Sequence, residues 1–164
     1  EAVRLGVSLL TVHTVGGGEM LKAAVEGARG SSTRILGVTV LTSHDGASLA
    51  ETGFGDDLHQ TVLRLGSLGI RSGIDGVVAS PHEIHSLREH LGSDVLIVTP
   101  GIRSAGEASG DQRRTMSASE ALDAGADYLV VGRPITKATD PVEAARNIMT
   151  GTTSGSGLDV ETSA

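Results

Sequence analysis

The sequence has no cysteine and very few aromatic residues, and both shortages exclude classes of function. Its 164 residues include one tyrosine, one phenylalanine and no tryptophan. Without cysteine there is no disulfide, thiolate nucleophile or cysteine-ligated metal, and a cytoplasmic location is the default expectation. The formal net charge is −7, so the chain offers nucleic acid neither a broad basic surface nor aromatic rings for its bases. We expect no nucleic-acid partner.

Long apolar runs are also missing. No stretch approaches the roughly 20 apolar residues that a membrane-spanning helix needs, so we expect no membrane association. The hydrophobic content of 38%, mostly valine, leucine, isoleucine and alanine, is typical of one globular domain. The chain opens at Glu1 rather than at methionine, and we expect it to be cut from a longer sequence.

Short apolar runs that indicate β-strands recur five times, at residues 8–13, 35–41, 76–80, 95–100 and 128–132. Each is followed by a polar or glycine-containing loop and then by apolar residues at helical spacing, in residues 20–29, 56–69, 81–91, 118–126 and 141–149. Alternating strands and helices predict a parallel sheet. The runs are continuously apolar, which predicts strands covered on both faces.

Two architectures fit five successive β/α units: an open doubly wound sheet, and a (β/α)8 barrel that lacks its first units. The last residues, 150–164, are small and polar with one leucine and one valine. Such a segment cannot bury enough apolar surface to order itself. We therefore predict a folded part at residues 1–149 and a disordered tail at residues 150–164.

Two loops that follow predicted strands combine glycine with arginine. Ligands of parallel α/β folds bind where the strands end, and here Gly101 precedes Arg103, while Gly132 precedes Arg133. Glycine lets the backbone approach a ligand closely, and arginine binds phosphate oxygens in pairs. Alone, Gly-Arg-Pro is more often a strand end with a solvated arginine. The second loop beside it favours a phosphate monoester site.

Other polar residues near strand ends are weaker candidates. Thr42 could hydrogen-bond a heterocycle, and Gln112 could bridge a base edge and a phosphate, since an amide both donates and accepts. A Ser43-His44-Asp45 triad is disfavoured because adjacent residues do not converge in that geometry. His82, Glu83 and His85 suggest a metal site, but they lack the spacing of a zinc helix, and the two histidines are interpreted as surface residues. For His13, a packed histidine is favoured over a ligand.

Six segments together resemble the orotidine 5′-phosphate decarboxylases. VTVLTS, DGVVAS, VTPGIR, GDQRRTMS and DYLVVGRPIT occur in the family's order, and TVHTVGGGEML resembles its fourth strand and exit. The resemblance covers about residues 2–148. It implies that the chain is the C-terminal part of the enzyme: strands four to eight, five of the eight units of a (β/α)8 barrel. It also implies a homodimer that converts orotidine 5′-monophosphate to UMP and carbon dioxide, in pyrimidine biosynthesis, without metal or organic cofactor.

The resemblance also assigns roles to the candidate residues. Thr42 would contact the pyrimidine, and Arg103 would lie by the phosphate end of the ligand. Gln112 would link phosphate and pyrimidine, while Gly132 and Arg133 would bind the phosphate.

The family's catalytic motif, Asp-x-Lys-x-x-Asp, does not occur in this sequence. We expect it upstream of Glu1, and we expect the chain as given to be inactive. Two alternatives remain open. One is another phosphate-binding barrel, of the hexulose-phosphate synthase or ketogulonate-phosphate decarboxylase type. The other is a non-catalytic half-barrel that binds nucleotide phosphate.

Overall fold

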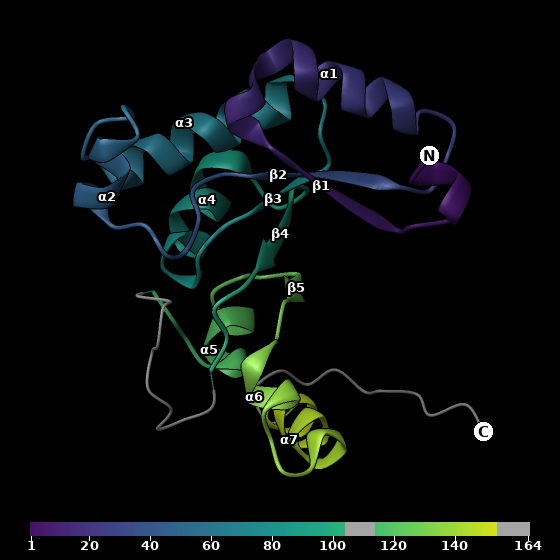
Figure 1. Cartoon of the computed structure of the whole chain (residues 1–164), viewed down its shortest axis with the longest axis vertical. Helices are drawn as coiled ribbons and strands as arrows, with labels where there is room; N and C mark the ends of the chain where they lie inside the picture. The colour runs from purple at the N-terminus through teal and green to yellow at the C-terminus, as the bar shows by residue number, and fades with distance from the viewer. Residues whose placement is uncertain (104–113, 154–164) are drawn as a thin grey trace.

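A single parallel sheet organises the molecule (Figure 1). The structure, a computed structural model, describes residues 1–103 and 114–153. Its five strands pair in parallel in the order β1-β2-β3-β4-β5. They are β1 (Leu9–His13), β2 (Arg34–Val38), β3 (Gly76–Val78), β4 (Leu96–Thr99) and β5 (Tyr128–Leu129). A doubly wound sheet reverses its strand order at a switch point, whereas this sheet follows chain order throughout. The prediction of a partial (β/α)8 barrel is confirmed.

Helices follow the strands as the sequence predicted, with two additions. The five predicted helices are α1 (Gly17–Ala28), α3 (Leu58–Arg71), α4 (Ile84–Leu91), α5 (Ala118–Asp123) and α7 (Pro141–Thr153). The unpredicted helices are α2 (Gly46–Glu51) and α6 (Arg133–Thr136). Three short 3₁₀ turns are η1 (Val3–Leu5), η2 (Thr14–Gly16) and η3 (Pro81–Glu83). Helix α7 includes residues 150–153, which the sequence analysis had assigned to a disordered tail, so that boundary was wrong.

Side-chain caps fix where several helices begin. Asp45 accepts a hydrogen bond from the backbone N–H of Ser48 and starts α2, and Ser117 and Glu120 form a reciprocal capping box at α5. Asp140 accepts from the N–H groups of residues 142 and 143 at the start of α7. Each cap satisfies N–H groups that have no partner inside the helix.

The core lies between one face of the sheet and the helices. In Figure 1, α1, α3 and α4 lie beside β1–β4, and α5, α6 and α7 gather near β5. The main cluster contains side chains with no exposed surface, among them Val62, Val77, Ile84, Leu87 and Ile97. Burial of each such side chain contributes about 1.5–3 kcal/mol before entropy costs. A second cluster packs α1 against β1 and β2.

The other face of the sheet is open at its outer strands, which corrects the prediction of strands covered on both faces. On β1, Leu10 and Val12 pack against the helices, but His13 is exposed. At the opposite edge, Tyr128 is 48% and Val130 is 52% exposed. The inner faces of barrel strands cover one another only when the barrel is closed. These side chains are exposed because the five strands here do not close.

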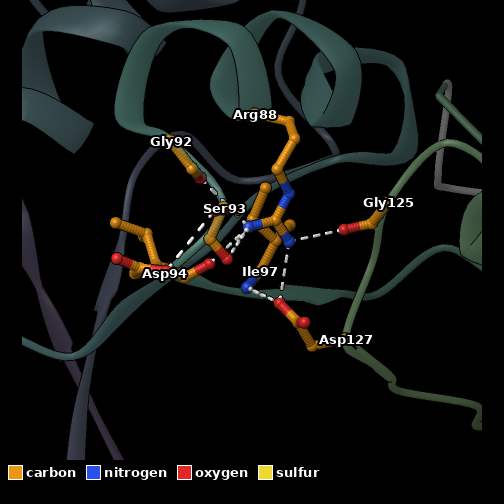
Figure 2. A network of polar contacts seen from close by, with 8 residues as sticks. Arg88, Gly92, Ser93, Asp94, Ile97, Gly125 and Asp127 are labelled. Carbon is orange, nitrogen blue, oxygen red and sulfur yellow. Dashed lines mark hydrogen bonds and ion pairs between the residues drawn. The ribbon is translucent and has the colours of Figure 1, made fainter.

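The amino-terminal ends of the strands are held by two equivalent aspartates and one arginine. Asp75 accepts a hydrogen bond from the N–H of Ile35 at 2.7 Å, and Asp127 accepts one from the N–H of Ile97, also at 2.7 Å. Figure 2 shows that Arg88 of α4 reaches the same place. Its guanidinium donates to Asp127 and to the carbonyls of residues 92, 93, 95 and 125, at 2.6–3.2 Å. The network ties α4 to the starts of β4 and β5.

Among the described helices, none combines the length and the apolar character needed to cross a membrane.

Candidate functional site

The exits of β4 and β5 lie side by side, which brings the two glycine-arginine loops together. Thr99 is paired with Leu129, and the N–H of Val130 donates to the carbonyl of Thr99 at 2.9 Å. Pairing therefore continues to the last residue of β4. The chain then enters Gly101 and Arg103 from β4, and Gly132 and Arg133 from β5. All strands are parallel, so these residues share the carboxyl edge of the sheet.

The β4 exit is fixed by a sharp turn and by a short pairing with a later segment. Gly101 is buried and has φ of 84°, a left-handed backbone conformation that residues other than glycine rarely adopt. Ile102 forms an isolated parallel bridge with Met116. The N–H of Arg103 donates to the carbonyl of Met116 at 3.0 Å, and the N–H of Met116 donates to Gly101 at 3.3 Å. Arg103 thus projects from a hydrogen-bonded backbone.

At the β5 exit, the sheet ends and the short helix α6 begins. The carbonyl of Gly132 accepts from the N–H groups of Ile135 and Thr136, at 2.9 and 3.0 Å. A Cβ atom built on Gly132 would have no heavy atom within 4 Å, so the space beside its backbone is open. Arg133 is exposed and Pro134 is buried. The break from strand into Gly-Arg-Pro exposes the glycine backbone while proline anchors the helix.

The β2 exit carries Thr42. Its side chain is partly exposed and follows Leu41, whose carbonyl accepts the N–H of His44 at 3.0 Å. Thr39 is 4% exposed and donates its hydroxyl to the carbonyl of Val78. Thr39 therefore belongs to the sheet, whereas Thr42 is partly exposed and Ser43 is exposed in the loop that follows.

A cavity of about 160 Å³ lies beside the exits of β1 and β2. A cavity of similar size holds one benzene ring. None of the residues that the sequence predicted for ligand binding lines it. Its walls are mainly apolar: His13, Val15, Thr39, Val40, Leu41, His44, Leu49, Thr52, Phe54, Thr61 and Leu65.

The sequence analysis missed a buried ion pair at the same edge. Glu83, at the end of η3, is 4% exposed and accepts a hydrogen bond from Nη1 of Arg114. The Arg114 side chain is 11% exposed, and its Nη2 donates to the carbonyl of Leu41 at 3.0 Å. Burial raises the pKa of the Glu83 carboxyl, an effect that the Arg114 guanidinium only partly offsets. The partners are 31 residues apart, so no local motif could reveal them.

The expectations for the remaining polar residues have different outcomes in the structure. His82 and His85 are exposed, as predicted. His13 is exposed and lines the cavity, so its interpretation as a packed histidine was wrong. Gln112 lies outside the described residues. Within residues 1–103 and 114–153, no group of three or more histidine or acidic side chains is placed to hold a metal ion.

Comparison with known proteins gives consistent similarities. A family model described as "Orotidine 5'-phosphate decarboxylase / HUMPS family" matches residues 1–148. A protein of Anaeromyxobacter sp. (strain K), named "Orotidine 5'-phosphate decarboxylase", is 49% identical over 151 residues, which are 92% of this chain and 66% of the relative. A protein of the same name from Moorella thermoacetica is 50% identical over 154 residues, 89% of this chain and 61% of the relative. The chain thus spans less than two thirds of the length of these relatives.

Solved structures agree with the sequence matches. A crystal structure titled as orotidine 5'-phosphate decarboxylase from Lactobacillus acidophilus superposes with a TM-score of 0.77 at 36% identity. It covers 92% of this chain, which spans 65% of that structure. An uncharacterized conserved protein from Geobacillus kaustophilus gives a TM-score of 0.74 at 32% identity, covering 92% of this chain and 66% of that structure.

Proposed function

Because the chain belongs to the orotidine 5'-phosphate decarboxylase / HUMPS family, we propose that it supplies the ligand-binding strand ends of an orotidine 5′-phosphate decarboxylase. The proposed enzyme converts orotidine 5′-monophosphate to UMP and carbon dioxide, in pyrimidine biosynthesis in the cytoplasm, without metal or organic cofactor. The observation that carries the proposal is the pairing of the β4 and β5 exits. It sets two glycine-arginine loops side by side, an arrangement suited to a phosphate monoester.

In this proposal each loop meets a different part of the ligand. Gly132 offers open space beside its backbone, so the phosphate approaches there and Arg133 pairs with its oxygens. Arg103 lies at the phosphate end from the β4 side. Thr42, two strands away, contacts the pyrimidine. Gln112 is proposed to link the phosphate and the base.

The phosphate contacts are remote from the bond that breaks. Binding energy from such contacts can be used to organise the reacting end of a substrate. In the proposed reaction the bond between C6 and the carboxylate carbon breaks, its electron pair stays on C6, and a lysine delivers a proton there. The two lysines of this chain do not suit that role. Lys22 pairs with Glu19 on the exposed surface of α1, and Lys137 follows α6. Neither lysine belongs to an Asp-x-Lys motif.

We therefore propose that the proton donor comes from outside residues 1–164, and that β1–β5 correspond to strands four to eight of the complete barrel. The order of the strand-exit motifs along the chain supports this numbering, since the two phosphate loops then follow strands seven and eight, a frequent phosphate site in (β/α)8 barrels.

We also propose that the enzyme is a homodimer whose interface includes the exits of β1 and β2. Val15, Leu41 and Phe54 are 51%, 47% and 38% exposed, and all three line the cavity at the exits of β1 and β2. Exposed apolar side chains that gather at one place mark interaction surfaces. Sedimentation velocity over a range of concentrations tests the proposal, and a monomer at all concentrations would exclude it.

The experiment for the function measures ligand binding and turnover on the complete gene product, with any residues that it has outside 1–164. We expect loss of orotidine 5′-monophosphate absorbance over time, and tighter binding of UMP than of hexulose phosphates. Arg133→Met should weaken UMP binding strongly. Tight binding of a sugar phosphate without binding of UMP would instead indicate a barrel of the hexulose-phosphate synthase or ketogulonate-phosphate decarboxylase type. Binding of UMP without turnover would indicate a non-catalytic module that binds nucleotide phosphate.

A further inference from the structure

Two of the proposed ligand residues belong to strands that are not neighbours. Thr42 follows β2 and Arg103 follows β4, and β3 lies between these strands in the sheet. Ladder hydrogen bonds therefore do not join the two exits directly. A ligand whose base meets Thr42 and whose phosphate meets Arg103 needs their separation to be fixed by something else.

The segment 114–116 contacts residues that follow β2, β3 and β4, and so joins the two exits. At one end, Arg114 donates to the carbonyl of Leu41, the residue before Thr42. At the other end, Met116 exchanges backbone hydrogen bonds with Gly101 and Arg103, at 3.3 and 3.0 Å.

Between these ends the segment is held to the β3 exit. His82 contacts the carbonyl of Thr115 through Nε2 at 3.3 Å, and Glu83 accepts from Arg114. The three parallel strand exits are thus linked through three consecutive residues.

The Glu83–Arg114 ion pair is the part of this link that cannot easily rearrange. Both side chains are almost fully enclosed, so neither charge can exchange its partner for water at low cost. Glu83 is itself fixed, since its N–H donates to the carbonyl of Ser80 at 3.0 Å. Within the described residues, Arg114 Nε has no hydrogen-bond partner, and burial raises the pKa of Glu83 although Arg114 and Ser80 both lower it. Burial of this ion pair therefore costs free energy, so a gain in stability does not explain why the pair is present.

We propose that Glu83 and Arg114 are a positioning pair, whose buried contact sets the separation of Thr42 and Arg103 and so the length of ligand that the site accepts. Neither residue needs to touch the ligand. The identity of the ligand, a pyrimidine nucleoside monophosphate, rests on the proposed function; the positioning itself rests on the contacts of Arg114 and Met116.

The test compares a ligand that spans both exits with ligands that reach only one. UMP, uridine and inorganic phosphate are titrated calorimetrically into the gene product and into Glu83→Gln and Arg114→Lys. Arg114→Lys keeps the charge but loses the fork that holds Glu83 and Leu41 together. We expect UMP affinity to fall about tenfold, within the usual range for coupled sites. The affinities for uridine and phosphate should change by less than about twofold, as for independent contacts.

The matched control is Arg88→Lys, which disturbs the network at the opposite ends of the strands (Figure 2). It should lower the melting temperature and leave UMP affinity unchanged. If UMP affinity is unchanged in Glu83→Gln and Arg114→Lys, or if all three ligands weaken equally, the positioning role is wrong and the proposed function stands.

A second measurement works without any ligand. Residues 1–164 contain no cysteine, so spin labels within them can be placed at Ser43→Cys and Arg103→Cys alone, with any cysteine outside them replaced by serine. We expect a narrow distance distribution that broadens when Glu83→Gln or Arg114→Lys is added, and an unchanged width would overturn the inference. If the unsubstituted protein fails to bind UMP, the proposed function is wrong, and this measurement still decides the positioning role.

Discussion

Removal of Arg114 should make the stability of the protein strongly dependent on pH. Arg114→Met leaves the Glu83 carboxylate 4% exposed and without its cation. An uncompensated buried charge of this kind costs about 3–5 kcal/mol at neutral pH. For a protein of this size, each kcal/mol corresponds to about 2–4 °C of melting temperature. We therefore expect a fall of about 6–20 °C.

The sign of the pH dependence follows from the direction of the pKa shift. Burial raises the folded-state pKa of Glu83 above its ordinary value of 4.5. The folded chain therefore holds this proton more tightly than the unfolded chain. The resulting stabilisation is complete below the ordinary pKa and is lost as pH rises through the folded pKa. Arg114→Met removes the main group that lowers this pKa, so its deficit should grow from about pH 5 to about pH 8.

Urea unfolding followed by circular dichroism at those two pH values measures both effects. Glu83→Gln combined with Arg114→Met has no buried charge and should be more stable than Arg114→Met at about pH 8. Lys22→Met, which breaks an exposed ion pair with Glu19, serves as the control and should change little at either pH. A deficit for Arg114→Met below about 1 kcal/mol, or one equal at both pH values, would refute the account of a buried, costly pair.

Three further substitutions test other parts of the structure. Arg133→Met should cost about 1.5–3 kcal/mol of UMP binding with little change in melting temperature, because Arg133 is exposed; calorimetry that shows unchanged affinity would remove Arg133 from the site. Arg88→Met should lower the free energy of unfolding by about 2–4 kcal/mol, since hydrogen bonds to four carbonyls and to Asp127 are lost together; a cost below about 1 kcal/mol in urea unfolding would mean that water replaces them. Asp75→Ala should cost about 1–3 kcal/mol, because it leaves the N–H of Ile35 buried without its acceptor; hydrogen exchange at that amide, if no faster than in the unsubstituted protein, would contradict this.

Local patterns were enough to predict the strands, but not their ends. Residues 128–132 were predicted as one strand, whereas β5 ends at Leu129. Hydrophobic pattern reports side chains that prefer burial, but strand length depends on a partner. β5 lies at an edge and pairs only with β4, so Val131 leaves the sheet although it is apolar.

Missed helices have a different cause. Residues 46–51 make less than two turns of α-helix, too short for apolar spacing to show. The available signal was Asp45 three residues before Ser48, which cap each other in the structure. A search for caps rather than for periodicity would have found α2.

The candidate site could be predicted only where its residues follow strands directly. Gly101, Arg103, Gly132 and Arg133 were predicted because parallel topology places all carboxyl ends at one edge. Glu83 was considered only within a histidine-rich segment, since its partner is distant in sequence. Strand pairing brings such residues together, and one sequence does not report it.

Under the proposed function, one end of the sheet serves stability and the other serves ligand binding, and this division makes the predictions separable. Arg88, Asp75 and Asp127 satisfy backbone groups at the strand starts, where no buried side-chain nitrogen or oxygen of the described residues lacks a partner. At the strand exits, Thr99 Oγ1 and Arg114 Nε are buried without partners in the described part of the chain. Such groups cost folding free energy. Selection for stability alone would remove such groups. They are expected at the edge proposed to bind the ligand if the positions of its polar side chains matter more than stability. Substitutions at the starts should therefore change melting temperature without changing ligand preference, and substitutions of Glu83 or Arg114 should change both.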